Sequence, residues 1–217
     1  MKSTILRDCL VGSVLAATVQ TAFCQGTLYT SRSAFEGALS SSTTINFEDI
    51  PSTLPGGLGE WSVASSGVVF TNPAPLIYVA DPNGSFHPIP GTGKYIWNFD
   101  GGYPVSILLP TGVTAFGADF SGGIEPNPAF NAILTVNLAG GASYAFNFSG
   151  PRGSWTFFGV TFAQPIANLV YDDRGSFLHE EMMDNVTFGS AIPEPSGLGL
   201  FALGALLLGW RVVRRKI

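Results

Sequence analysis

Cysteine is missing from the part of the chain that would form a folded domain, because Cys9 and Cys24 both lie in the first 24 residues. A domain at residues 25–190 therefore has no disulfide bond and no cysteine metal ligand. Charged residues are also scarce, at 12% of the chain. This domain has four basic and thirteen acidic residues. It is not expected to bind nucleic acid, because phosphate contacts need surface lysine and arginine.

Glycine, proline and phenylalanine are abundant instead, with 27, 15 and 17 residues. Glycine and proline favour turns, and phenylalanine favours pleated surfaces. Several segments alternate with the period of a strand, so that Ala132, Leu134, Val136 and Leu138 share one face. The pattern predicts an all-β fold, a two-sheet β-sandwich of jelly-roll type. About eleven strands are expected, at residues 44–48, 68–71, 76–80, 95–98, 105–109, 113–120, 131–138, 143–148, 155–162, 166–171 and 185–188.

One short N-terminal helix is expected before the strands, over residues 30–39. Phe35 and Leu39 are four residues apart and therefore share a helix face. Ser33 and Glu36 have the spacing of a capping box, in which each side chain bonds to the other residue's backbone amide. These two features predict where the helix begins and which face it buries.

Residues 1–24 have the pattern of a signal peptide. Lys2 and Arg7 form a basic start, a short apolar stretch follows, and small residues precede a cleavage position between Cys24 and Gln25. The apolar stretch is too short to span a bilayer comfortably. The chain is therefore expected to be exported; a buried helix of the domain is the alternative.

Residues 191–217 predict a membrane anchor. The motif Pro193-Glu194-Pro195 comes first, and residues 197–213 are long enough to cross a bilayer as one helix. The prolines keep the motif extended, so that a processing enzyme can bind it. A plain single-span anchor behind a proline linker is the alternative. Four basic residues are expected to stay cytoplasmic by the positive-inside rule: Arg211, Arg214, Arg215 and Lys216.

This tail resembles the PEP-CTERM sorting signal of Gram-negative bacteria. The matching features are Pro193-Glu194-Pro195, the Gly/Ala/Leu-rich span and the arginine-rich end. The resemblance implies export, anchoring in the inner membrane during sorting, and recognition by the membrane transpeptidase exosortase near the motif. It also implies a final place at the cell surface or in the extracellular matrix, because the family is associated with exopolysaccharide and biofilm production.

The domain at residues 25–190 is similar to β-sandwich domains that often precede PEP-CTERM tails. Such domains look similar to carbohydrate-binding jelly rolls, so the resemblance implies this fold and, by analogy alone, a polysaccharide ligand. The matching stretches are AFE at 34–36, INFEDIP at 45–51, GVTAFG at 112–117, FFGV at 157–160 and MDNVTFG at 183–189.

Three carboxylates are the candidate metal ligands. Glu48 and Asp49 leave the first expected strand, and Asp184 enters the last. The terminal strands of a jelly roll are often neighbours, so these oxygen ligands are candidates to hold Ca²⁺ with backbone carbonyl groups. Ordinary turn capping is the alternative. No other cofactor is predicted.

Exposed aromatic rings are the candidate glycan contacts, because flat rings match the apolar faces of sugars. Trp61, Trp97 and Tyr103 are the candidates, with a place in the core as the alternative. These features predict an exported, non-enzymatic surface or matrix protein that binds polysaccharide. A purely structural envelope or biofilm component is one alternative. The other is an extracellular glycan hydrolase, which needs two converging carboxylates; the candidates by type are Asp119, Glu125, Asp172 and Asp173.

Overall fold

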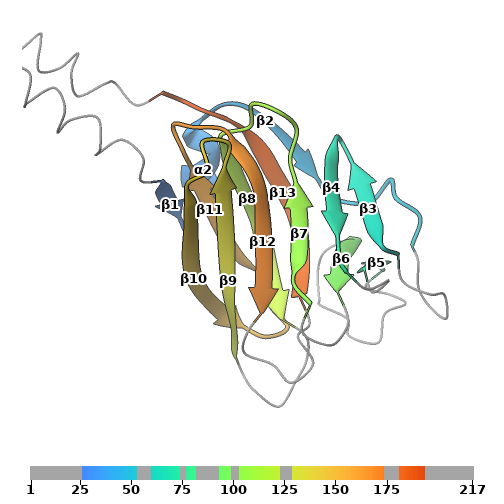
Figure 1. The fold of residues 1–217 in the computed structure, drawn as a ribbon. Coiled ribbons are helices and arrows are strands. Elements are labelled where there is room, and N and C mark those ends of the chain that lie inside the picture. Colours follow the sequence, from blue (N-terminus) through green and yellow to red (C-terminus); the bar gives the residue numbers. More distant parts are fainter. Residues whose placement is uncertain are drawn as a thin grey trace, which may run out of the picture. The chain divides into compact units, whose positions relative to one another are not determined.

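The computed structural model describes residues 26–52, 60–73, 77–81, 93–98, 103–122, 129–173 and 181–193. Within the compact unit Gly26–Ala191, these residues build two sheets that pack face to face (Figure 1). All paired strands are antiparallel. The expected two-sheet β-sandwich is therefore confirmed.

The sheet at the back of Figure 1, which we call sheet A, has seven strands. Its order is β1–β11–β8–β13–β6–β5, and β2 pairs with the second half of β13. Its strands are β1 (Thr27–Tyr29), β2 (Leu39–Ile45), β5 (Ile77–Ala80), β6 (Tyr95–Asn98), β8 (Ala115–Gly122), β11 (Thr156–Thr161) and β13 (Glu181–Ala191).

The sheet at the front, sheet B, has six strands in the order β10–β9–β12–β7–β4–β3. Two tight hairpins, β3–β4 and β9–β10, form its edges. Its strands are β3 (Ser62–Ser65), β4 (Val68–Thr71), β7 (Val105–Leu108), β9 (Ala129–Leu138), β10 (Ser143–Pro151) and β12 (Ile166–Asp173).

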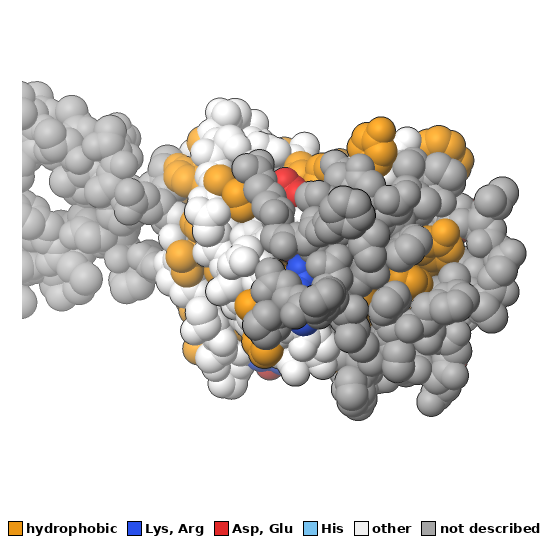
Figure 2. All heavy atoms as spheres, turned by 90° about the horizontal axis from the view of Figure 1, so that it is seen from below, with side chains coloured by type: hydrophobic (Ala, Val, Ile, Leu, Met, Phe, Trp, Pro, Cys, Tyr) orange, Lys and Arg blue, Asp and Glu red, His pale blue; other side chains and the backbone are white. Residues whose placement is uncertain are grey.

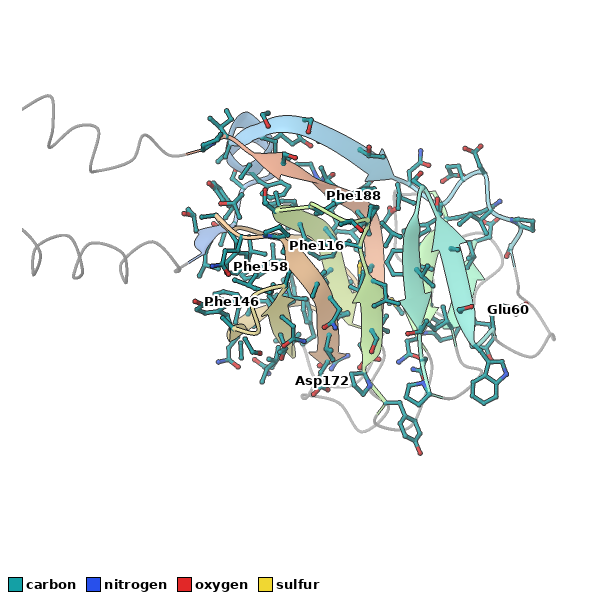
Figure 3. All side chains as sticks on the ribbon, turned by 45° about the horizontal axis from the view of Figure 1, so that its top comes forward. Glu60, Phe116, Phe146, Phe158, Asp172 and Phe188 are labelled. Atoms are coloured by element: carbon teal, nitrogen blue, oxygen red, sulfur yellow. The ribbon has the colours of Figure 1, made fainter. Side chains whose placement is uncertain are left out.

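Phenylalanine fills much of the space between the sheets. Phe116 and Phe188 face inward from sheet A, and Phe146 packs against this core from β10 (Figure 3). The alternation predicted for β9 is confirmed, because its even-numbered side chains are buried. On β10, Tyr144, Phe146 and Phe148 are half-buried while their neighbours are exposed. Burial of these apolar faces therefore sets the register of both strands.

A short helix, α2 (Arg32–Gly37), lies against β11. Its buried side chain is Phe35, which packs over the paired glycines Gly117 and Gly159. A Cβ at either glycine would come within 3.0 Å of the Phe35 ring, so the two glycines make room for it. The helix is shorter than expected, and the capping box was wrong: Ser31 is the N-cap and accepts from the backbone amide of Ala34.

The main error in the strand prediction concerns β2. Residue 39 was expected to be helical and residues 44–48 to form a strand, whereas the strand runs from Leu39 to Ile45. Its middle five residues are exposed serines and threonines, so no apolar alternation marks it. β2 is held by backbone pairing with β13 instead. The short strands β1 and β3 were also missed.

The expected signal peptide at residues 1–24 and the expected membrane helix at 197–213 lie outside the described residues. Among the residues that are described, no helix has the length and apolar character needed to cross a bilayer.

Candidate functional site

Two aromatic side chains project into solvent at one end of the sandwich. Trp61 precedes β3 and is 61% exposed, and Tyr103 precedes β7 and is 48% exposed. The starts of β3 and β7 lie at the lower end of Figure 1, which Figure 2 views directly. In that view the described hydrophobic side chains reach the surface in separate groups, with few charged side chains between them. Trp61 and Tyr103 thus keep the exposure that a stacking contact needs.

A single buried amide holds the backbone at both aromatic positions. Asn72, which follows β4, donates its backbone N–H to the Trp61 carbonyl oxygen at 3.2 Å. Its side-chain Nδ2 donates to the Tyr103 carbonyl oxygen, also at 3.2 Å. Because Asn72 is only 4% exposed, water competes little for these bonds. Asn72 therefore links the backbones of Trp61 and Tyr103.

The amide of Asn72 belongs to a longer chain of buried polar groups. Its Nδ2 also donates to Oδ1 of Asn98 at 2.6 Å. Asn98 in turn donates through Nδ2 to Oε2 of Glu181 at 2.6 Å and to the Tyr103 carbonyl oxygen at 3.0 Å. The other carboxyl oxygen of Glu181 accepts from the backbone N–H of Asp173 at 3.2 Å. This buried network joins the ends of β4, β6 and β12 to the start of β13.

A buried ion pair extends the network on the sheet B side. Nη2 of Arg152 lies 3.3 Å from Oδ2 of Asp173, and both side chains are almost completely buried. Nε of Arg152 donates to the carbonyl oxygen of Ala129 at 3.2 Å. Such a pair costs desolvation energy and needs good geometry and further hydrogen bonds to be tolerated. It therefore holds this end of the sandwich in one arrangement.

Glu181 is a member of this network whose pKa is strongly shifted by its surroundings. Burial raises its pKa from 4.5 to about 8, against the lowering effect of its hydrogen bonds from Asn98 and Asp173. The carboxyl is therefore mainly neutral at pH 7. Burial also raises the pKa of the nearby Tyr171 hydroxyl well above its ordinary value, and the Glu181 and Asp173 carboxylates add to this. That hydroxyl donates to the Ser121 carbonyl oxygen at 3.3 Å.

Trp97 was wrongly placed among the glycan contacts. It is only 3% exposed and packs against Tyr78, with ring centroids 5.8 Å apart. Together with Ala80, Tyr95 and Met182 it forms a small second core. Its strand neighbour Ile96 joins the main core on the opposite face of sheet A. Both faces of this part of the sheet are thus apolar, and a ring buried in such a face cannot stack on a sugar.

The three predicted calcium ligands do not converge. Glu48 is held by Lys94, whose backbone N–H donates to Oε1 at 2.7 Å and whose Nζ donates to the Glu48 carbonyl oxygen at 3.0 Å. Asp49 is exposed. Asp184 is buried and accepts the backbone N–H of Asn185 at 2.6 Å. Across the described residues, no three acidic, histidine or cysteine side chains are grouped as a metal site requires.

Asp184 nevertheless lies in a distinct electrostatic environment. Burial, with smaller contributions from the carboxylates of Asp119 and Glu48, raises its pKa to about 7, while the Asn185 amide and Arg32 act in the opposite direction. Asn185 has a positive φ of 47°, at a bulge in β13. The side-chain Nδ2 of Asn185 donates to Oδ2 of Asp119 at 3.0 Å and to Oδ2 of Asp184 at 3.2 Å.

Two of the carboxylates considered for hydrolysis, Asp119 and Asp173, are engaged in structural contacts. Asp119 forms an ion pair with Arg32 at 3.0 Å and accepts from Asn185. Asp173 is paired with Arg152. Neither arrangement leaves two free carboxylates facing each other across a cleft, as glycoside hydrolysis requires. Glu125 lies outside the described residues.

The residues of the buried network were not found from the sequence. The available signal was an asparagine at the end of a strand, at Asn98 in β6 and at Asn72 directly after β4. Nothing in the spacing connects these two residues with Glu181 or with Arg152. The network exists because strands distant in the sequence end at the same level of the sandwich.

The sorting signal can be assigned independently of this site. The sequence profile of the PEP-CTERM protein-sorting motif matches residues 191–216. The chain therefore carries a PEP-CTERM sorting motif. Pro193 is exposed, whereas Glu194, Pro195 and the basic residues Arg211, Arg214, Arg215 and Lys216 lie outside the described residues, as do Cys24 and Gln25.

Comparison of this PEP-CTERM protein with other proteins gives distant likenesses only. No curated protein sequence matches the chain. Among solved structures, it resembles the CBM22-1 xylan-binding domain from Paenibacillus barcinonensis, with 10% identity, a TM-score of 0.42, and coverage of 70% of this chain and 95% of the other. For the K2 cleaved adhesin domain of Lys-gingipain, the sequence identity is 12% and the TM-score is 0.43, with coverage of 70% of this chain and 99% of the other. For a family 11 carbohydrate-binding module from Clostridium thermocellum, the sequence identity is 13% and the TM-score is 0.38, with coverage of 70% of this chain and 98% of the other. Likenesses at this level do not identify a ligand.

Proposed function

We propose that this PEP-CTERM protein is a non-enzymatic component of the cell surface or extracellular matrix that binds exopolysaccharide through Trp61 and Tyr103. The supporting observation is that two exposed rings lie just before β3 and β7, and that the backbone carbonyl oxygens of both residues accept hydrogen bonds from one buried residue, Asn72. A backbone held in place at both positions lowers the conformational freedom that is lost when the rings stack on a sugar. The two-sheet sandwich beneath them acts as the support.

A binding role fits the site better than a hydrolytic role. The carboxyl closest to the aromatic pair through hydrogen bonds is Glu181, which is buried and tied to Asn98 and Asp173. A general acid must instead reach the glycosidic oxygen of a bound substrate. A purely structural role in the envelope stays open to the same experiment, because it predicts no retention by any glycan.

The binding proposal is tested by affinity electrophoresis of the full-length protein in mild detergent, through gels that contain neutral bacterial or plant polysaccharides. We expect retention by at least one polysaccharide, and a three- to tenfold weaker affinity for Trp61→Ala or Tyr103→Ala, since a stacked ring contributes about 0.5–1.5 kcal/mol. Leu28→Ala is the control, because Leu28 is exposed to a similar degree and lies on β1. Equal retention of all three variants would contradict the proposal.

The same gels test the calcium prediction. The gels are repeated with added Ca²⁺ and with a chelator, and thermal unfolding is measured in the same two conditions. Retention or thermal stability should differ between the conditions if Glu48, Asp49 or Asp184 takes part in a calcium site. An unchanged profile in both conditions would remove calcium from the account and leave the aromatic contacts standing.

We also propose that an exosortase-type transpeptidase processes the chain while residues 197–213 hold it in the inner membrane. The support is the PEP-CTERM match at residues 191–216. Replacing Pro193, Glu194 and Pro195 together by alanine should leave the unprocessed protein in the membrane fraction. Normal processing of this triple variant would show that the motif does not direct sorting.

A further inference from the structure

The last residue of the sandwich is firmly attached to the sheet. The backbone N–H of Ala191 donates to Oγ1 of Thr114 at 2.8 Å, and Ala191 pairs with Leu39 of β2. One residue earlier, the carbonyl oxygen of Ser190 accepts from Oγ of Ser40 at 3.1 Å. The N–H of Thr114 donates to the Gly189 carbonyl oxygen at 2.9 Å. The fold therefore continues up to Ala191.

The sorting motif begins almost immediately after this point. Only Ile192 separates Ala191 from Pro193. A residue spans at most about 3.6 Å along an extended chain, so Pro193 is within about 7 Å of the last paired residue. An enzyme that binds an extended peptide surrounds it on several sides. The chain connection therefore brings an enzyme that binds this motif close to the last residues of β13.

The surface at this end of the sandwich is small-residue and uncharged. A shallow pocket of about 230 Å³ lies there between β2, the turn before β8 and the end of β13. Its exposed wall is formed by Ser41, Ser42, Thr43 and Thr111, and Phe188 lies at its base. None of these side chains is charged. We call this the motif-end surface.

The strand that borders this surface also has a free edge. Among the described strands, β2 pairs only with β13, so its other edge carries backbone groups available to a partner. Gly189 keeps β2 close to β13, because a Cβ there would overlap the carbonyl oxygen of Ser41. An extended segment of a protein partner can pair with such an edge while serine and threonine hydroxyls bond to its polar groups.

We propose that the motif-end surface is a contact site for the membrane enzyme that processes the PEP-CTERM motif. This inference rests on the proposed sorting by that enzyme. A protein partner fits this surface better than a lipid surface does, because membrane interfaces are contacted by lysine, arginine, tryptophan and tyrosine, and the pocket wall has none of these. Recognition would thus extend from the three motif residues onto the folded domain.

The contact can be tested by photocrosslinking of the full-length protein in cells that contain the sorting enzyme. A photoreactive phenylalanine analogue is placed at Ser42 or, as the control, at Ala145, which is equally exposed on β10. We expect an adduct with the processing enzyme from position 42 and little from position 145. Equal adducts from both positions, no adduct, or adducts with lipid alone would overturn the proposal.

A kinetic test complements the crosslink. Ser42→Glu and Thr111→Glu place a charge on the motif-end surface, and each should slow processing about fivefold, as for a contact of ordinary importance at an interface. Ala145→Glu is the matched control and should be processed at the normal rate. Thermal unfolding of each variant shows whether the fold is intact. Normal rates for the folded Ser42 and Thr111 variants would refute the contact.

The two levels of the proposal fail in different ways. If the triple alanine variant of Pro193-Glu194-Pro195 is processed normally, the sorting function itself is wrong. If that variant is blocked while the Ser42 and Thr111 variants behave as wild type, sorting stands and only the contact with the folded domain is lost.

Discussion

Strand β13 connects two ends of the sandwich that are built by opposite means. It begins at Glu181 in the buried network and ends at Ala191 beside the sorting motif, about 33 Å away at the usual rise of a strand. We call the first the network end; in Figure 3, Asp172 marks this lower end and Phe188 lies toward the upper one. The network end is held by side-chain hydrogen bonds, whereas the motif end is held mostly by backbone pairing between β13 and β2.

The difference shows how one fold can support two kinds of recognition. Buried polar groups are costly unless each has a partner, so Asn72, Asn98 and Glu181 tolerate few alternative arrangements. The rings of Trp61 and Tyr103 above them are therefore well positioned for a ligand of defined shape. The motif end relies on backbone pairing and on the close approach of β2 to β13 at Gly189.

The largest expected effect comes from the buried ion pair at the network end. Arg152→Met leaves Asp173 charged and buried without its partner, and we expect a loss of about 3–5 kcal/mol in the free energy of unfolding. Glu36→Gln is the comparison, because Glu36 is about half exposed in its pair with Arg32 and its loss should cost about 0.5 kcal/mol or less. Chemical denaturation measures both. Equal losses would show that the network end is not the more rigid one.

The motif end is tested by Gly189→Ala. The added Cβ would overlap the Ser41 carbonyl oxygen, so we expect a loss of about 1–3 kcal/mol as β2 is pushed from β13. The control is Gly37→Ala, since nothing lies within 4 Å of a Cβ at that position. Hydrogen exchange should show weaker protection of β2 amides in the Gly189 variant. Unchanged protection would mean that β2 does not depend on this close approach.

The protonation of Glu181 gives stability at the network end a particular pH dependence. Its pKa is raised from 4.5 to about 8 in the folded state, so the folded protein binds more protons than the unfolded chain between these values. The free energy of unfolding should therefore fall as pH rises from about 4.5 to 8, by up to about 1.4 kcal/mol per pH unit. Asp184, with a pKa of about 7, contributes in the same direction at lower pH.

Two variants separate these contributions in denaturation experiments at several pH values. Glu181→Gln should remove most of the decline between pH 7 and 8 and leave a smaller part that comes from Asp184, which is half ionised at pH 7. Asp184→Asn should flatten the decline mainly below pH 7. An unchanged decline between pH 7 and 8 in Glu181→Gln would exclude Glu181 as its main source.

The smallest expected effect on stability is that of the exposed ring. Trp61→Ala should change the free energy of unfolding by no more than about 0.5 kcal/mol, as at other exposed positions. Trp97→Ala is the contrast, because it empties a buried site and should cost about 3–5 kcal/mol. If Trp61→Ala were as destabilising as Trp97→Ala, the ring would be structural and the proposed glycan contact would lose its main support.

The successes and failures of the sequence predictions have a common cause. The strands β4 and β6 were predicted with their observed bounds, and β9 with its buried face, because apolar side chains on these strands face a core. β2 was missed because its serines and threonines face solvent and its position depends on a backbone partner far away in the sequence. Trp97 was misassigned because the sequence does not show whether an aromatic side chain on a strand faces solvent or a second buried cluster.

By itself, the amino-acid sequence determined the β-rich fold class, the acidic and cysteine-free character of the domain, and the sorting motif, since each depends on composition or on neighbouring residues. Only the tertiary structure decided which rings are exposed, which acids are neutralised by a partner, and that Asn72, Asn98 and Glu181 meet. Those properties depend on which strand ends lie side by side. That arrangement is set by long-range pairing between segments that carry no local record of one another.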